Sequence, residues 1–179
     1  MFEPLLLAWY LQLPVIVGGV LHMVVVTRNL WPALCVPVNR RLFGANKTWR
    51  GMLAVPLLTA FGALLLYPAE RLLGDWSPFS GEALWLAGMV AGLGYVLAEL
   101  PNSFIKRRLG VAPGETPEKA RYLFILMDQL DSGIGVALAY VLFLDVSWPV
   151  FAAFVLSFPL TALVVKHLLY WARLKKSAV

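Results

Sequence analysis

Hydrophobic residues run in long blocks along this 179-residue chain, and short polar stretches separate the blocks. A helix needs about 20 mostly apolar residues to cross the hydrocarbon core of a bilayer. Five blocks approach or exceed this length and predict five transmembrane helices, at residues 4–26, 52–73, 83–100, 123–144 and 148–171. Pro14 and Pro159 lie inside two of these spans, where neighbouring helices can satisfy the carbonyl groups that proline frees.

Composition supports an integral membrane protein. Hydrophobic residues make up 60% of the chain and charged residues 14%, whereas an average soluble domain carries about 25% charged residues. The mean hydropathy is +0.76. We therefore predict an all-α bundle of five transmembrane helices that forms a single membrane domain over residues 1–179. The first block lacks the basic region of a signal peptide, so we expect it to be retained as a helix.

Basic residues are distributed asymmetrically between the predicted connections. Every Lys and Arg except Arg71 falls in the first or third connection, at the end of the fifth span or in the tail. Because cytoplasmic loops carry the excess of Lys and Arg, this pattern predicts an outside N-terminus and a cytoplasmic C-terminus. The cytoplasmic loops are then residues 28–50 and 101–122. The opposite connections are short or acidic, so we expect any chemistry in these two loops and the adjoining helix ends.

Two carboxylates lie near the start of the fourth predicted span. Asp128 and Asp131 are three residues apart and therefore share one helical face. An unpaired charge at this depth is costly, which makes intramembrane acids candidates for function. One partner is a basic side chain such as Lys106, in a structural ion pair. The other is Mg²⁺, which proteins hold with one or two carboxylates plus water and substrate phosphates. The neighbouring cationic loop favours Mg²⁺, with the ion pair as the alternative.

The first cytoplasmic loop contains GANKTWRG at residues 44–51. Two glycines flank Asn46, Lys47, Thr48 and Arg50, a set of amide, hydroxyl and cationic groups that suits phosphate. The segment is not a P-loop, because the required upstream glycine spacing is missing. The alternative is an ordinary helix start whose basic side chains reach the lipid surface.

A second polar cluster follows the third predicted span on the same side of the membrane. Pro101 is expected to break or kink the helix there. Lys106 follows Glu99 by seven residues, about two helical turns, so both can lie on one wall. Arg108 is expected to act mainly as a lipid anchor. The candidate binding residues of this cluster are Glu99, Asn102, Ser103, Lys106 and Arg107.

Glycines predict where helices approach closely. Gly88 and Gly92 have GxxxG spacing and are followed by Gly94, while Gly133 and Gly135 lie in the fourth span. Small residues allow backbones to come together in lipid. The alternative is that glycine is simply more frequent in membrane helices.

Three ordered motifs resemble those of a known enzyme family. GANKTWRG, ELPNSFIKRRLGVAPG and DQLDS are similar to motifs of the CTP-dependent phosphatidate cytidylyltransferases, most closely the branch that makes CDP-archaeol. The broader signature of a serine, Lys-Arg and two aspartates three apart matches Ser103, Lys106-Arg107, and Asp128 with Asp131. The broader family's Lys-Asp and His-Gly-Gly elements are missing from residues 115–127, so the shorter archaeol-type relatives are the better template.

The resemblance implies transfer of a cytidylyl group from CTP to a membrane lipid phosphate of the 2,3-bis-O-geranylgeranylglycerol type, releasing pyrophosphate. It implies Mg²⁺ held by Asp128 and Asp131, which with Lys106 form the catalytic set. It also implies a set of residues that bind CTP and phosphate: Asn46, Lys47, Thr48, Arg50, Glu99, Asn102, Ser103 and Arg107. His22 and His167 are expected to be packing or interfacial residues.

The implied partners are CTP, the lipid phosphate and the bilayer, with no nucleic acid, and a homodimer is compatible with the resemblance. The implied location is the plasma membrane, as a multi-pass protein with its active site on the cytoplasmic side. One alternative is the same chemistry on diacyl phosphatidate, making CDP-diacylglycerol. An alternative of another class is a small lipid or ion transporter, which would explain intramembrane acids but not the gathering of polar loops on one face.

Overall fold

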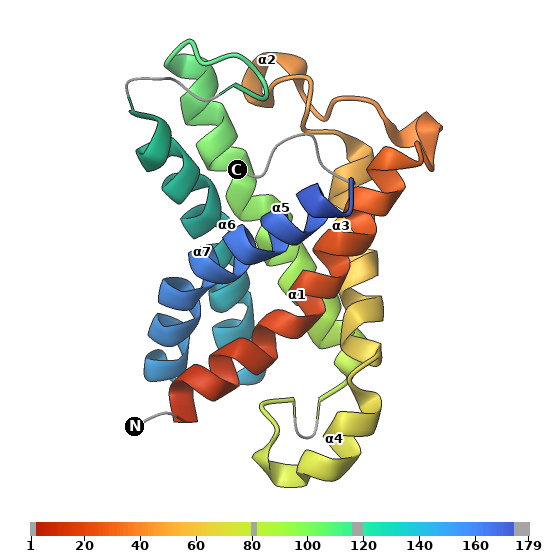
Figure 1. Cartoon of the computed structure of the whole chain (residues 1–179), viewed down its shortest axis with the longest axis vertical. Helices are drawn as coiled ribbons and strands as arrows, with labels where there is room; N and C mark the ends of the chain where they lie inside the picture. Colours follow the sequence, from red (N-terminus) through yellow and green to blue (C-terminus); the bar gives the residue numbers. More distant parts are fainter. Residues whose placement is uncertain (1–2, 80–81, 116–119, 174–179) are drawn as a thin grey trace.

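The computed structural model describes residues 3–79, 82–115 and 120–173, which fold as a helical bundle (Figure 1). Extended pairing within this part is limited to one isolated antiparallel bridge between Pro37 and Thr48. The elements in chain order are α1 (Glu3–Thr27), η1 (Pro32–Leu34), α2 (Arg40–Phe43), α3 (Trp49–Leu64), α4 (Tyr67–Leu73), η2 (Gly74–Trp76), α5 (Leu84–Arg108), α6 (Arg121–Leu144) and α7 (Trp148–Trp171).

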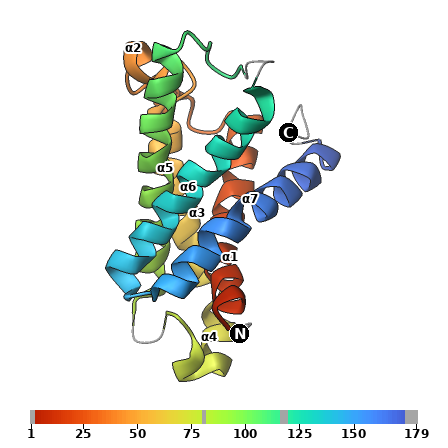
Figure 2. The ribbon, with the colours of Figure 1, turned by 90° about the vertical axis from the view of Figure 1, so that its left-hand side faces the viewer.

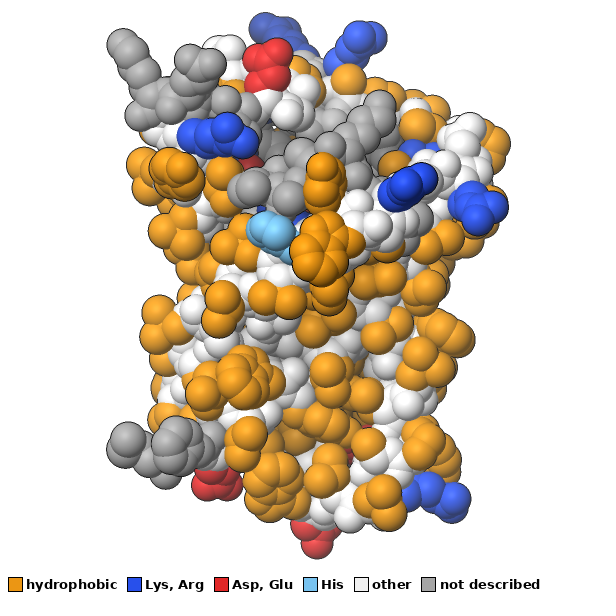
Figure 3. Space-filling model, in the orientation of Figure 1, with side chains coloured by type: hydrophobic (Ala, Val, Ile, Leu, Met, Phe, Trp, Pro, Cys, Tyr) orange, Lys and Arg blue, Asp and Glu red, His pale blue; other side chains and the backbone are white. Residues whose placement is uncertain are grey.

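The number of candidate membrane spans depends on one bend. Helices α1, α5, α6 and α7 are each long and apolar enough to cross a bilayer. Helix α3 and the α4–η2 segment form a further candidate only if counted together, and they are bent by 47°. The described residues therefore hold four candidate spans, or five with the bent pair. Figure 3 shows a broad band of hydrophobic side chains across the middle of the face in view, as a membrane protein requires.

The second predicted span, residues 52–73, is not one straight helix. Helix α3 ends at Leu64, and the chain turns before α4 begins at Tyr67. Pro68 lies in the first turn of α4, where its missing N–H group has no intrahelical partner to lose. In the interior of a longer helix the same proline would remove a hydrogen bond, and the chain therefore restarts here.

The third predicted span ends later than expected. Helix α5 continues through Pro101 to Arg108, eight residues beyond the predicted end at residue 100. Two side chains of the following turns, Asn102 and Lys106, contact carboxylates of α6 and hold this extension in place. Tertiary contacts thus outweigh the local tendency of Pro101 to end the helix.

Helix α5 lies at the centre of the bundle and packs against both α3 and α6. A Cβ atom on Gly94 would lie 2.4 Å from the carbonyl oxygen of Gly135 on α6. Similarly, a Cβ atom on Gly92 would lie 2.5 Å from Cα of Pro56 on α3. Real side chains do not tolerate such distances, so the prediction of close glycine-mediated packing is confirmed for these helices.

Aromatic side chains fill the bundle toward the α4 end. Phe79, in the connection after η2, is 1% exposed and lies between Tyr10 and Tyr140. Tyr140 in turn packs edge-on against Phe154, with ring centroids 6.1 Å apart. Glu70 accepts hydrogen bonds from Tyr10 and from Ser77. These contacts close the α4 end and leave the opposite end to carry the polar motifs.

The opposite end, here called the cationic end, is where α1, α5 and α7 finish and α3 and α6 begin (Figures 1 and 2). Arg71 lies on α4, away from this end. Three lysines that contribute to the predicted charge asymmetry lie outside the described residues: Lys119, Lys175 and Lys176. The described basic residues of the cationic end are Arg28, Arg40, Arg41, Lys47, Arg50, Lys106, Arg107, Arg108, Arg121, Lys166 and Arg173.

Candidate active site

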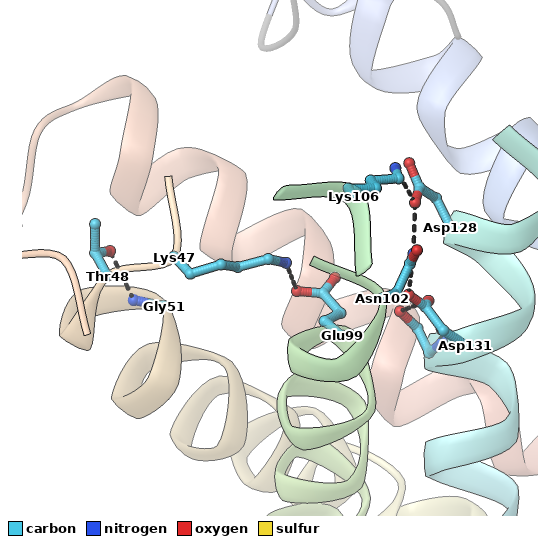
Figure 4. A network of polar contacts seen from close by, with 9 residues as sticks. Lys47, Thr48, Gly51, Glu99, Asn102, Lys106, Asp128 and Asp131 are labelled. Carbon is cyan, nitrogen blue, oxygen red and sulfur yellow. Dashed lines mark hydrogen bonds and ion pairs between the residues drawn. The ribbon is translucent and has the colours of Figure 1, made fainter. Parts of the chain in front are cut away.

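The loop between α1 and α3 is ordered by its own backbone. Asn39 caps α2 by accepting hydrogen bonds from the backbone N–H groups of Arg41 and Leu42. The N–H of Val38 donates to the carbonyl oxygen of Lys47 at 2.8 Å, which fixes the chain just before α3. The side chain of Lys47 then extends toward α5 and contacts the carboxylate of Glu99 (Figure 4).

Two further residues of the GANKTWRG segment have structural contacts: Thr48 at the end of the loop and Arg50 in the first turn of α3. Thr48 caps α3 by accepting a hydrogen bond from the N–H of Gly51 at 3.4 Å. Arg50 is 8% exposed and donates to the side chain of Asn29 and the carbonyl oxygen of Leu30, beyond the end of α1. Both were predicted as phosphate-binding residues, and neither lines the cavity that the other candidates share.

The two aspartates of α6 converge on one amide of α5. Nδ2 of Asn102 lies 2.6 Å from a carboxylate oxygen of Asp128 and 2.6 Å from one of Asp131. Asp128 also accepts from the ammonium group of Lys106, and Asp131 accepts from the hydroxyl group of Ser132 at 2.9 Å. Figure 4 shows these groups between α5 and α6, with Lys47 and Glu99 beside them. The ion pair with Lys106, which was the alternative to Mg²⁺, is present at Asp128, and Asp131 is held by neutral donors.

A cavity of about 260 Å³ joins these groups. All predicted site residues except Thr48 and Arg50 line it: Asn46, Lys47, Glu99, Asn102, Ser103, Lys106, Arg107, Asp128 and Asp131. The lining also includes residues that sequence reasoning missed, namely Tyr95, Gly114, Glu115, Gln129 and Lys166. Tyr95 precedes Glu99 by one helical turn, so helical spacing offered a signal for it. Gln129 directly follows Asp128 and therefore lies on a different face of α6, so helical spacing gave no signal for it. Lys166 lines the cavity because of how α7 packs against α1 and α6, and spacing along one helix does not predict such packing.

Arg107 and Arg108 are neighbours with different environments. Nε and Nη1 of Arg107 are buried without a hydrogen-bond partner among the described residues, and the side chain lines the cavity. The guanidinium group of Arg108 lies 4.8 Å from the ring centroid of Phe104, on the exposed surface. Because buried N–H groups normally have partners, Arg107 is suited to an anionic ligand that enters the cavity.

Comparison with known protein families shows which family this chain belongs to. The family model described as "CarS-like: CDP-archaeol synthase" matches residues 2–176. The chain belongs to the CDP-archaeol synthase family. A CDP-archaeol synthase of Methanoregula boonei is 31% identical over 145 residues, which cover 77% of this chain and 81% of that protein.

Two further relatives carry the same name. A CDP-archaeol synthase of Aeropyrum pernix is 32% identical over 137 residues, 75% of this chain and 64% of that protein. One of Thermococcus onnurineus is 38% identical over 77 residues, 42% of each chain. No solved structure matches this chain.

In this member of the CDP-archaeol synthase family, the carboxylates of the candidate site suit a hard divalent cation. No group of three or more His, Cys, Asp or Glu side chains within the described part of the chain is arranged to hold a metal ion by itself. Asp128 and Asp131 nevertheless each direct a carboxylate oxygen toward the same place, where both accept a hydrogen bond from Nδ2 of Asn102. Mg²⁺ is commonly held by two carboxylates when water and substrate phosphates complete the octahedron. The pair therefore fits a cation that is shared with a phosphate ligand.

The formal charges around the cavity are balanced before any ligand enters. Four cationic residues among the described lining are matched by four acidic ones: Lys47, Lys106, Arg107 and Lys166 against Glu99, Glu115, Asp128 and Asp131. A nucleoside triphosphate and a phosphomonoester together bring several negative charges. A cavity with no net charge would bind them better with an additional divalent cation.

Proposed function

We propose that this protein transfers the cytidylyl group of CTP to a membrane lipid phosphate of the archaeol type. A phosphate oxygen of the lipid attacks the α-phosphorus of CTP, and the bond between the α-phosphorus and the bridging oxygen to the β-phosphate breaks. The products are CDP-archaeol and pyrophosphate. Membership of the CDP-archaeol synthase family supports this reaction.

One observation carries the proposal for this site: three separate motifs line the same cavity. Lys47 comes from the loop before α3, Lys106 from the last turn of α5 and Asp131 from the first half of α6. Such a combination of cations and carboxylates suits a polyphosphate bound together with a metal. A lipid phosphate lies at the depth of membrane headgroups, and the membrane arrangement proposed below would place the cationic end near that depth.

The cationic side chains would hold the two anions against their mutual repulsion. Arg107 has buried N–H groups that can bind a phosphate in a forked arrangement. Lys47 and Lys106 would exchange their present carboxylate contacts for phosphate oxygens as the ligands enter. The second pKa of a phosphomonoester is about 6, so the lipid phosphate is largely dianionic at neutral pH and needs no general base. Positioning and electrostatics supply most of the catalysis in such transfers.

The polar side chains would orient the substrates. Asn102 would keep the two aspartates converged, while Asn46 and Ser103 offer hydrogen bonds at the cavity wall. Asp128 and Asp131 would hold Mg²⁺, which when bound supplies positive charge to the triphosphate and its leaving pyrophosphate. Thr48 and Arg50 would act indirectly, by fixing the loop that carries Lys47.

We also propose the membrane arrangement expected from the charge pattern. The N-terminus is outside, the C-terminus is cytoplasmic, and α3 with α4 forms a bent fifth span. Residues 28–50 and 101–122 are then cytoplasmic loops, and the cavity faces the cytoplasm of a plasma-membrane protein, where CTP is available. A homodimer stays a prediction.

The proposed reaction is tested with purified protein, Mg²⁺ and CTP labelled at the α-phosphate. We expect label to move into lipid with an archaeol-type phosphate, more efficiently than with diacyl phosphatidate. Preference for phosphatidate would indicate a CDP-diacylglycerol synthase. Movement of lipid or ions across vesicles without formation of any CDP-lipid would instead favour the transporter hypothesis.

A further inference from the structure

An apolar groove adjoins the polar cavity. It has a volume of about 180 Å³ and lies where α7 crosses α1 (Figure 1). Its walls include Val15, Ile16 and Met23 of α1, and Val165 and Leu169 of α7. Most of these side chains are only partly buried, so the groove reaches the surface of the bundle.

The groove and the cavity share part of their lining. Tyr95 of α5, Gln129 of α6 and Lys166 of α7 contribute to both. A ligand with a phosphate in the cavity can therefore extend an attached chain directly into the groove. A lipid phosphate has this shape, because its hydrocarbon chains begin only a few bonds from the phosphate.

Two adjacent glycines of α1 have different surroundings. A Cβ atom on Gly18 would lie 2.3 Å from Oγ1 of Thr59, so this glycine is required for packing against α3. A Cβ atom on Gly19 would meet nothing within 4 Å, although Gly19 lines the groove. Helix packing therefore does not require a glycine at position 19, and the space beside it belongs to the groove.

We infer that the α1–α7 groove binds the glycerol-proximal part of one lipid chain of the substrate, and that Gly19 sets the room available to that chain. The inference rests on the proposed function for the identity of the substrate. Apolar walls favour the hydrocarbon chain, while the shared residues lie where the chain joins the polar headgroup. His22 also lines the groove, which gives this half-buried histidine a place beside the lipid instead of in the phosphate cavity.

The first test fills the groove. Gly19→Leu places an isobutyl group in the space that the chain would occupy, and replacing a helical glycine with leucine favours the helix. We expect KM for the lipid phosphate to rise roughly tenfold, which corresponds to loss of contact with about two methylene groups. KM for CTP should change little. Ala152→Leu places the same side chain on the exposed surface of α7 and is the matched control. Equal lipid KM values in the two variants would overturn the inference.

The second test does not depend on turnover, so it separates failure of the inference from failure of the proposed function. The probe is a lipid phosphate with a photoreactive diazirine near the glycerol end of one chain. We expect cross-links on residues 15–23 and 158–169 in the wild type and the Ala152→Leu variant, and several-fold fewer in Gly19→Leu. Cross-links spread over other helix faces, or unchanged by Gly19→Leu, would show that the chain lies elsewhere even if CDP-lipid is formed.

Discussion

Lys47 contacts Glu99 across 52 residues of sequence and joins the loop before α3 to the last turns of α5. About a fifth to a quarter of each side chain is exposed, so a ligand in the cavity can reach the pair. The contact holds the ammonium group beside the acidic residues of α6 before substrate binds. It thereby links the loop motif to the site.

Removing the ammonium group of Lys47 should weaken binding of the CTP triphosphate. For Lys47→Met we expect kcat/KM for CTP to fall roughly ten- to hundredfold, because a charge-assisted contact with phosphate is lost and the Glu99 carboxylate is left unpaired. Steady-state kinetics with varied CTP measure the effect. Arg40→Met removes the same charge from the exposed surface of the same loop and should change kcat/KM much less.

A second substitution separates these two causes. In the Lys47→Met background, Glu99→Gln removes the unpaired carboxylate, so we expect part of the lost kcat/KM to return. If kcat/KM for CTP is the same in the double variant as in Lys47→Met, the unpaired Glu99 carboxylate repels CTP only weakly.

The aspartate pair should be indispensable. Asp128→Asn and Asp131→Asn should each lower turnover at least about a hundredfold, because either change removes a carboxylate that we propose binds Mg²⁺. The rate of CDP-lipid formation across a Mg²⁺ titration measures the loss. Asp145→Asn is the control, since Asp145 ends α6 at the α4 end in a left-handed conformation that Asn also adopts. Near-normal activity of the Asp128→Asn/Asp131→Asn protein would contradict the metal-binding role.

Arg107 and Arg108 offer a comparison between adjacent residues. Arg107→Ala should raise KM for one or both substrates roughly tenfold or more, because its side chain lines the cavity and Nε and Nη1 have no hydrogen-bond partner among the described residues. Arg108→Ala should have a smaller effect, since its guanidinium group packs on Phe104 at the surface. Equal KM values in the two variants would contradict this distinction.

The contact between α5 and α6 should limit stability. Gly94→Ala places a methyl group 2.4 Å from the Gly135 carbonyl oxygen, so the helices must separate. We expect destabilisation of about 1–3 kcal/mol, as for other overpacked interiors. Thermal unfolding in detergent measures it, with Gly19→Ala as the control because its methyl group meets open space. A Gly94→Ala protein as stable as Gly19→Ala would show that the interface is more adaptable than its backbone contacts indicate.

Cys35 provides a built-in reporter of membrane orientation. It is exposed in the loop between α1 and α3 and is the single cysteine of the chain. A membrane-impermeant maleimide should label it in inverted vesicles and not in intact cells. The Cys35→Ser/Asp75→Cys protein, whose cysteine lies in η2 near the α4 end, should show the opposite pattern. Labelling of Cys35 in intact cells would show that its loop lies outside, opposite to the proposed topology.

Most of the helices and much of the candidate site could be predicted from the sequence. Long apolar blocks specified α1, α6 and α7 to within about two residues at each end, because a helix in lipid must satisfy its own backbone hydrogen bonds. Helical spacing placed Asp128 and Asp131 on one face. It did not predict the break before Pro68 or the passage of α5 through Pro101, since both depend on what the neighbouring residues contact.

Which polar residues contact one another could not be predicted without the packed bundle. Thr48 and Lys47 are neighbours in a motif, yet Thr48 caps a helix while Lys47 reaches Glu99. The groove beside Gly19 likewise exists only because α7 crosses α1. Helix formation follows from local hydrogen bonding and the thickness of the bilayer, which a sequence expresses directly. Contacts between helices follow from how their side chains fit together, and that fit belongs to the whole bundle.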